Sequence, residues 1–142
     1  MTTFYLAFQN TSNPVDTPYT WNSFQTPATS LATSLLDSTG ATVARTITLS
    51  SASININSYG LNVVGTGDAS WVNQALITDQ TWTFSSARTM TFGGLDNSKR
   101  YTMSFFGSQD GTGTNLLNVT INGVAKQLNI SMNSSSTIEF ID

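Results

Sequence analysis

The sequence predicts an all-β fold, in the form of an antiparallel β-sandwich, and three observations lead to this prediction. About nine or ten short apolar segments recur at intervals of about 8–12 residues, separated by turn residues. Asn, Ser and Thr make up about two-fifths of the chain, and their short polar side chains suit solvated strand faces better than helix interiors. Asn122-Gly123 lies between two apolar strands, as in a two-residue hairpin. We therefore expect a jelly-roll or immunoglobulin-like sandwich.

Length and charge limit the possible organisation and partners. A chain of 142 residues is long enough to bury a continuous core, so we expect a single domain spanning residues 1–142. The formal net charge is -3, and the five basic residues are scattered. Nucleic acid and anionic membrane surfaces both require clustered Lys and Arg, so neither is an expected partner. The N-terminus does not resemble a signal peptide, and no apolar stretch reaches transmembrane length.

Two residue types are missing, and their absence excludes several chemistries. The chain contains neither Cys nor His. Disulfides and zinc sites with thiolate or imidazole ligands are therefore impossible, as are Ser-His and Cys-His nucleophile pairs. The predicted turns account for most Asp residues, because Asp bonds readily to nearby backbone groups. A glycosidase pair of carboxylates is the remaining catalytic alternative, and we expect no enzyme and no cofactor.

The N-terminal third begins with a predicted strand at residues 4–8, where Phe4, Leu6 and Phe8 alternate with other residues. A proline-containing loop is expected over residues 10–27, with Trp21 folding back toward the core. Leu35 and Leu36 precede a turn at residues 37–40, and a strand is favoured there over a helical turn.

The middle of the chain contains the clearest period-2 pattern of the N-terminal half, over residues 43–49. Arg45 lies on the apolar side of that predicted strand, either at a sandwich end or paired with an acid. Short strands are expected at residues 54–56 and 59–64, followed by a turn at 65–68. One short helix is predicted at residues 69–79, with Asp68 or Ser70 as its N-cap.

A tyrosine corner is predicted where the next strands follow one another. Strands are expected around residues 82–84 and 90–92, and a central strand over 101–106. Leu95 and Tyr101 are spaced as in a corner, in which the ring is buried and the hydroxyl bonds to the upstream backbone. Gly107 ends the strand at a point where a side chain would obstruct packing.

The C-terminal segment combines a hairpin with a final strand. Asn122 and Gly123 both tolerate positive φ and therefore fit a type I′ turn, with the return strand at residues 125–130. The last strand is expected at residues 138–141. Its sequence lacks the proline or polar tail that blunts an exposed sheet edge, so we expect it either to be central or to pair with something else.

The order of motifs in the C-terminal two-thirds resembles a known group of β-sandwich modules. The motifs are a Gly-Leu-x-x-Ser-Lys-x-Tyr segment from Gly94, then Phe-Phe-Gly-Ser, an open loop, and strand-Asn-Gly-strand. This order is similar to fibronectin type III and galactose-binding-like modules of bacterial carbohydrate-active proteins and phage structural proteins. The resemblance covers residues 61–142 best. Gln109 stands where many relatives carry Arg, and this difference weakens any inherited ligand site.

Two sets of residues are candidates for ligand binding. Four aromatic residues could stack on sugar rings, and packing in the core is the alternative for each: Tyr19, Trp21, Tyr59 and Trp71. In the loop at 109–115, Asp110, Thr112 and Asn115 present oxygen atoms at spacings that suit Ca²⁺. The loop contains a single acid, so an unliganded flexible loop is the alternative.

Two functional hypotheses follow from these observations. The first is a structural module on a virion surface, such as a phage head-decoration, head-fibre or tail-associated protein, working in many copies. Low charge, Thr/Ser/Asn-rich strand faces and the apparent lack of a signal peptide favour it. The second is an extracellular carbohydrate-binding module of a secreted bacterial protein. The expected partners are other copies of the chain or a larger scaffold, together with glycans.

Overall fold

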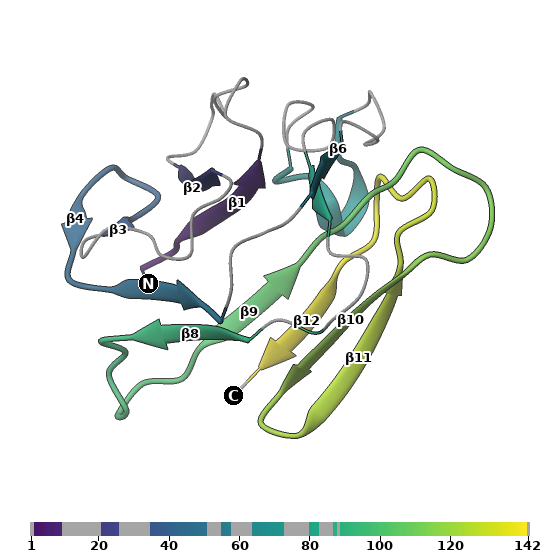
Figure 1. Ribbon diagram of the computed structural model, residues 1–142. Coiled ribbons are helices and arrows are strands. Elements are labelled where there is room, and N and C mark those ends of the chain that lie inside the picture. Colours follow the sequence, from purple (N-terminus) through teal and green to yellow (C-terminus); the bar gives the residue numbers. More distant parts are fainter. Residues whose placement is uncertain are drawn as a thin grey trace. The chain divides into compact units, whose positions relative to one another are not determined.

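The computed structural model describes residues 2–9, 21–25, 35–50, 55–57, 64–72, 80–82, 87 and 89–141. These residues confirm the predicted all-β class, because they contain twelve strands and one short 3₁₀ helix (Figure 1). The elements are β1 Tyr5–Gln9, β2 Trp21–Gln25, β3 Leu35–Leu36, β4 Thr42–Val43, β5 Thr46–Leu49, β6 Asn55–Asn57, η1 Gly67–Ala69, β7 Gln80–Trp82, β8 Met90–Gly93, β9 Thr102–Phe105, β10 Leu116–Ile121, β11 Val124–Asn129 and β12 Ile138–Ile141.

The contacts of the chain fall into two compact units. The first unit comprises Met1–Asn57 and Asp79–Asp96, and the second comprises Ser58–Thr78 and Asn97–Asp142. Every strand pair lies within one unit: β1–β2, β3–β4, β5–β8 and β6–β7 in the first, and β9–β12 and β10–β11 in the second. The sandwich arrangement and the single domain stay predictions.

The core of the first unit is built around the antiparallel pair β5–β8. Ile47 and Leu49 alternate with exposed Thr48, and both are buried with Leu35 of β3. Five partly buried hydrophobic side chains pack against these three: Phe4, Leu6, Val43, Met90 and Phe92. The period-2 pattern therefore predicted the buried face correctly.

The predicted continuous strand at residues 43–49 is wrong, because the chain changes partners within it. Residue Val43 pairs with β3, whereas β5 pairs with β8. Between them, the Arg45 N–H donates to the Val43 carbonyl at 2.8 Å, and Arg45 Nη1 donates to the Ala44 carbonyl at 2.9 Å. Two different pairing partners require a bend between them, which the alternation of side chains does not reveal.

The expected loop at residues 10–27 is also partly wrong, since Trp21–Gln25 forms strand β2 parallel to β1. Asn22 explains part of this pairing. Its side chain is buried and donates to the carbonyls of Tyr5 (3.2 Å) and Leu36 (2.7 Å), and it accepts from the Leu36 N–H (2.8 Å). A buried amide that bonds to the backbone on both sides holds β2 between its neighbours.

In the second unit, the larger buried cluster is formed by two antiparallel pairs. Strand β12 pairs with β9, β10 pairs with β11, and the two pairs lie beside each other in Figure 1. Leu128, Ile138 and Phe140 are buried, and five partly buried side chains pack around them: Phe105, Leu117, Val119, Ile121 and Ile130. The rings of Phe105 and Phe140 meet edge to face, with centroids 5.8 Å apart. Among the described strands, the ladder partner of β12 is β9.

The predicted Asn122-Gly123 hairpin of this unit is confirmed, whereas the strand expected to run up to Gly107 ends at Phe105. Asn122 and Gly123 have φ values of 49° and 80°, and Ile121 pairs directly with Val124, as a type I′ hairpin requires. A Cβ atom on Gly107 would lie 2.9 Å from Ile130 Cγ2. A side chain at this position would therefore obstruct the core.

The predicted helix at residues 69–79 is wrong in its first part. The helical turn is η1, which ends at Ala69, and Trp71 and Val72 are not helical. Asp68 lies inside the turn, and Thr66 occupies the N-cap position without a side-chain bond that caps the turn. One bond of this turn reaches a distant residue, because the Ala69 N–H donates to the carbonyl of Ser135 as well as to that of Thr66.

Several predictions are not tested by the described residues. Residues 73–79, Tyr19, Tyr59 and most of the strand expected at 59–64 lie outside the described residues. Leu95 belongs to the first unit and Tyr101 to the second, so the tyrosine corner stays a prediction. Within the described ranges, no helix is long and apolar enough to span a membrane.

Candidate functional site

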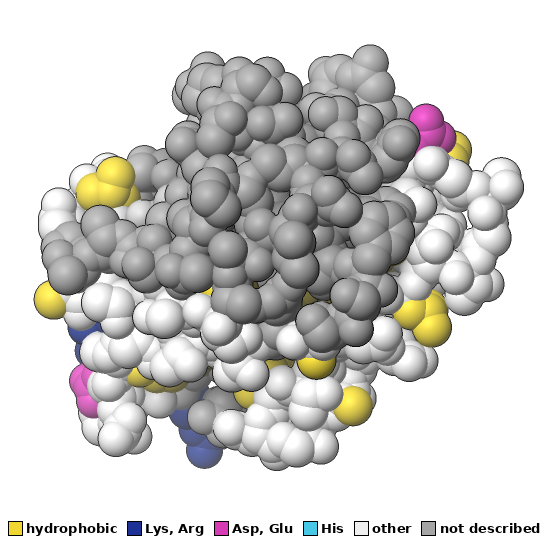
Figure 2. All heavy atoms as spheres, viewed as in Figure 1, with side chains coloured by type: hydrophobic (Ala, Val, Ile, Leu, Met, Phe, Trp, Pro, Cys, Tyr) yellow, Lys and Arg dark blue, Asp and Glu magenta, His cyan; other side chains and the backbone are white. Residues whose placement is uncertain are grey.

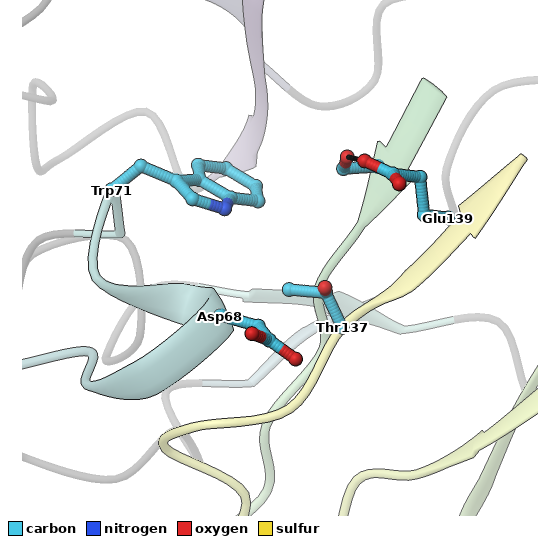
Figure 3. A pocket seen from close by; sticks show the side chains of 5 residues that line it. Asp68, Trp71, Thr137 and Glu139 are labelled. Carbon is cyan, nitrogen blue, oxygen red and sulfur yellow. Dashed lines mark hydrogen bonds between the residues drawn. The ribbon is translucent and has the colours of Figure 1, made fainter. Parts of the chain in front are cut away.

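An open hollow of about 410 Å³ lies within the second unit (Figure 3). Asp68 and Trp71 project toward it from η1 and the segment that follows, and Thr137 and Glu139 project from the β12 side. Ser104 of β9 completes the described lining. The volume is near the lower end of the range for small-molecule sites.

Trp71 is positioned by a tight loop of residues 65–72. The Gly65 N–H donates to the Val72 carbonyl at 3.1 Å and closes this loop. A Cβ atom at Gly65 would lie 2.1 Å from the Ala69 carbonyl oxygen, so only glycine fits there. Ala69 and Val72 are buried, and Trp71 and Phe106 pack against them. Half-buried Trp71 is thus anchored on one side and lines the hollow on another.

The opposite wall is built from a cross-strand pair. Ser104 on β9 is directly opposite Glu139 on β12, and Ser104 Oγ donates to Glu139 Oε1 at 3.1 Å. Their sequence neighbours Phe105 and Phe140 belong to the core cluster, because successive side chains of a strand point to opposite faces. The ladder therefore packs one face on the core and presents Ser104 and Glu139 on the other.

Asn133 organises the turn that precedes the β12 wall of the hollow. Its buried amide donates to the carbonyls of Gly107 and Ser136, both at 2.9 Å, and accepts from the Ser135 and Ser136 N–H groups. The turn that it organises also bonds to the η1 loop, since the Thr66 N–H donates to the Ser134 carbonyl at 2.7 Å. Asn133 is therefore a positioning residue for Thr137 directly, and for the η1 loop with Asp68 through the neighbouring Ser134 carbonyl.

Among the described lining residues, the ionisable side chains are both acidic. Asp68 and Glu139 are both exposed to solvent. Lys126 of β11 contacts the backbone near Glu139, donating to its carbonyl oxygen, and lies 5.1 Å from the centroid of the Phe140 ring. On the face of the molecule in Figure 2, the charged groups of the described part are few and scattered. The hollow is thus a local concentration of negative charge on a weakly charged chain.

The structure brings one of the four predicted aromatic ligand residues to this hollow, namely Trp71. Trp21 lies on β2 in the first unit, and Tyr19 and Tyr59 lie outside the described residues. Four lining residues were not predicted as a site: Asp68, Ser104, Thr137 and Glu139. Ser104 and Glu139 share an outward-facing register, but their pairing joins positions 35 residues apart. No local pattern in the sequence could show that.

The predicted calcium loop stays a prediction. Asp110 and Thr112 are exposed, and Asn115 is half-buried with its side-chain amide donating to Ser131 Oγ at 2.9 Å. In the described part of the chain, no group of three or more acidic side chains is placed to hold a metal ion.

No protein family, curated protein or solved structure matches the chain. The resemblance to fibronectin type III and galactose-binding-like modules therefore stays a prediction, and the chemistry of the hollow has to be argued from its residues. An indole beside two carboxylates and two hydroxyls offers an apolar wall and several hydrogen-bonding groups. This combination suits a small polar ligand that has one apolar face.

Proposed function

We propose that the chain is a non-enzymatic surface module, present in many copies on a virion, that attaches to host glycans. The observation that carries the glycan-binding part is the hollow in which Trp71 stands beside Asp68, Ser104, Thr137 and Glu139. A pyranose ring has an apolar face that stacks on an aromatic ring, and its hydroxyls bond to carboxylates and hydroxyl groups. Every lining side chain thus has a matching feature on a sugar.

Binding is favoured over catalysis by the surroundings of the two carboxylates. A glycosidase needs a carboxylic acid that stays protonated in apolar surroundings, beside a second carboxylate at a fixed separation. Both Asp68 and Glu139 are exposed, and Glu139 accepts a hydrogen bond from Ser104. Such an arrangement can orient a ligand but lacks the shielded acid.

The virion part of the proposal is supported by the surface. Exposed strand positions are mostly uncharged, as in β10, where Asn118 and Thr120 are exposed. Large apolar side chains are also exposed, including Ile141 with 76% of its surface accessible and Val124 with 54%. Neighbouring copies in an assembly would cover such groups.

A glycan array with the purified chain tests the proposed function. We expect binding to a limited set of glycans and loss of that binding in the variant Trp71→Ala. Because Trp71 also packs on Ala69 and Val72, Trp71→Phe serves as a second variant that keeps the packing and weakens the stacking. Absence of binding to every glycan, with the chain folded, would contradict attachment to glycans.

A carbohydrate-binding module of a secreted bacterial protein is the alternative, and the same hollow favours it. The two proposals differ in what surrounds the chain. A map of native virions that contains the chain in contact with other capsid or tail proteins would support the first. A catalytic domain in the same polypeptide would support the second and place the protein outside the cell.

A further inference from the structure

The charges around the hollow distinguish between classes of sugar. Its described lining contains two carboxylates and neither Lys nor Arg. An anionic sugar, such as a uronic or sialic acid, would meet two like charges, and none of the described lining residues compensates them. Like charges in one site disfavour binding, so the hollow discriminates against anionic glycans.

Lys126 does not remove this discrimination. Its ammonium group donates to the backbone carbonyl of Glu139 and lies near the ring of Phe140. Phe140 belongs to the core cluster, on the face of β12 opposite to the Glu139 side chain. Lys126 is not among the described lining residues, and its ammonium group is engaged by the Glu139 carbonyl and the Phe140 ring.

Trp71 and the two acids together match a cation carried on an apolar ring. The face of an indole attracts cations more strongly than other aromatic side chains do, and carboxylates accept charge-assisted hydrogen bonds from an ammonium group. The Ser104 and Thr137 hydroxyls provide uncharged partners for ring hydroxyls. A bare metal ion would use neither the indole nor the space in the hollow.

We propose that the hollow selects a hexopyranose with a free, protonated amino group, stacked on Trp71 with its ammonium near Asp68 and Glu139. This inference rests on the proposed glycan-binding function and names the class of sugar. N-acetylation removes the positive charge, so the acetylated sugar keeps the stacking and loses the attraction. The order of affinity is amino sugar, then neutral sugar, then anionic sugar.

Calorimetric titration with three trisaccharides of equal length tests this order: one of glucosamine, one of N-acetylglucosamine and one of galacturonic acid. At about pH 6 the amines are protonated. We expect the glucosamine trisaccharide to bind about tenfold more tightly than the N-acetylated one, and the anionic one to bind most weakly. The preference should shrink at high salt, because the attraction to exposed carboxylates is screened.

Variants of the hollow separate charge from stacking. Asp68→Asn and Glu139→Gln should each weaken glucosamine binding roughly threefold, and together roughly tenfold, with little effect on the N-acetylated sugar. Both side chains are exposed, so these variants should fold normally. Asp110→Asn is the matched control, because it removes the same charge from an exposed loop position outside the hollow lining. Trp71→Phe should weaken binding of both sugars.

Three results would overturn the inference. Equal or tighter binding of the N-acetylated sugar would remove the role of charge, while glycan binding itself would stand. An equal loss of glucosamine binding in Asp110→Asn would show that the net charge of the chain attracts the sugar, rather than the hollow. Failure of all three sugars, together with a blank glycan array, would remove the proposed function as well.

Discussion

Gly107 and Gly111 lie four residues apart, yet their surroundings differ sharply. A Cβ at Gly107 would meet Ile130 Cγ2 at 2.9 Å and Leu117 Cδ2 at 3.5 Å. The side chain of Ile130 is β-branched and packed, so it can move little to make room. We expect Gly107→Ala to lower the free energy of unfolding by about 1–3 kcal/mol. Urea denaturation followed by circular dichroism measures this change.

Gly111→Ala is the matched control for this prediction. The nearest atom to its Cβ would be Gln109 Nε2 at 3.7 Å, which is ordinary contact. This variant should be neutral or slightly stabilising, because alanine restricts the unfolded chain. Equal urea midpoints for the two variants would show that the close contact at Gly107 is absent.

Asn133 organises the turn before β12, which in turn bonds to the η1 loop. Replacing it by Ala leaves two carbonyls and two N–H groups without their partner, and we expect a loss of about 1–3 kcal/mol in the free energy of unfolding. Asn118→Ala is the control, since Asn118 is exposed and accepts one bond, from Gln127. Similar thermal midpoints for the two variants would contradict the role assigned to Asn133.

At the scale of single elements, the turn between β3 and β4 predicts a response to acid. The side-chain hydrogen bond from Thr39 is the main cause that lowers the pKa of Asp37 below its usual 3.8, aided by the Thr39 backbone N–H. A lowered folded-state pKa means that the unfolded chain binds the proton more readily. The stabilisation by Asp37 is therefore present above about pH 3.8 and is lost as the pH falls through the folded-state pKa.

Denaturant midpoints measured between about pH 6 and pH 2 should reveal this loss. In Asp37→Asn we expect a weaker decrease toward acid than in the natural sequence. Asp110→Asn removes an equal charge from another loop and should keep the decrease of the natural sequence. Parallel curves for Asp37→Asn and the natural chain would mean that the turn bonds do not involve the carboxylate.

At the scale of the whole molecule, the question is whether the two compact units unfold together, as the single-domain prediction requires. A single domain unfolds as one cooperative unit, so calorimetry should give one transition, with equal calorimetric and van't Hoff enthalpies. Two resolved transitions would instead show that the units defined by residues 1–57 with 79–96 and by residues 58–78 with 97–142 unfold separately.

Assembly also belongs to this scale. The backbone of β12 pairs with β9, and the Glu139 carbonyl accepts a hydrogen bond from Lys126. The side chain of Ile141, at the end of this strand, is apolar and exposed. We expect light scattering to detect self-association of the isolated chain at high concentration, and Ile141→Lys to reduce it. Thr120→Lys, at another exposed strand position, should have less effect. A monodisperse monomer that also lacks protein neighbours in its native setting would contradict assembly.

Local patterns in the sequence were enough to determine the all-β class, the buried faces and the tight turns of this protein. Alternation placed Ile47 and Leu49 inside, Asn122-Gly123 defined its hairpin, and Gly107 marked a position without room for a side chain. These features depend on neighbouring residues, whose spacing the sequence states directly.

The tertiary structure alone decided which distant segments meet. The β1–β2 pairing and the bend at Arg45 follow from partners that local patterns do not name. The helical turn at Gly67–Ala69 includes a hydrogen bond from the Ala69 N–H to the carbonyl of Ser135, 66 residues away in the sequence. The hollow likewise combines side chains from β9, η1 and β12, and only folding brings Trp71 to the same place as Glu139. Local patterns could not show these contacts, because long-range hydrogen bonds and core packing, rather than local propensity, select among the possible strand pairings.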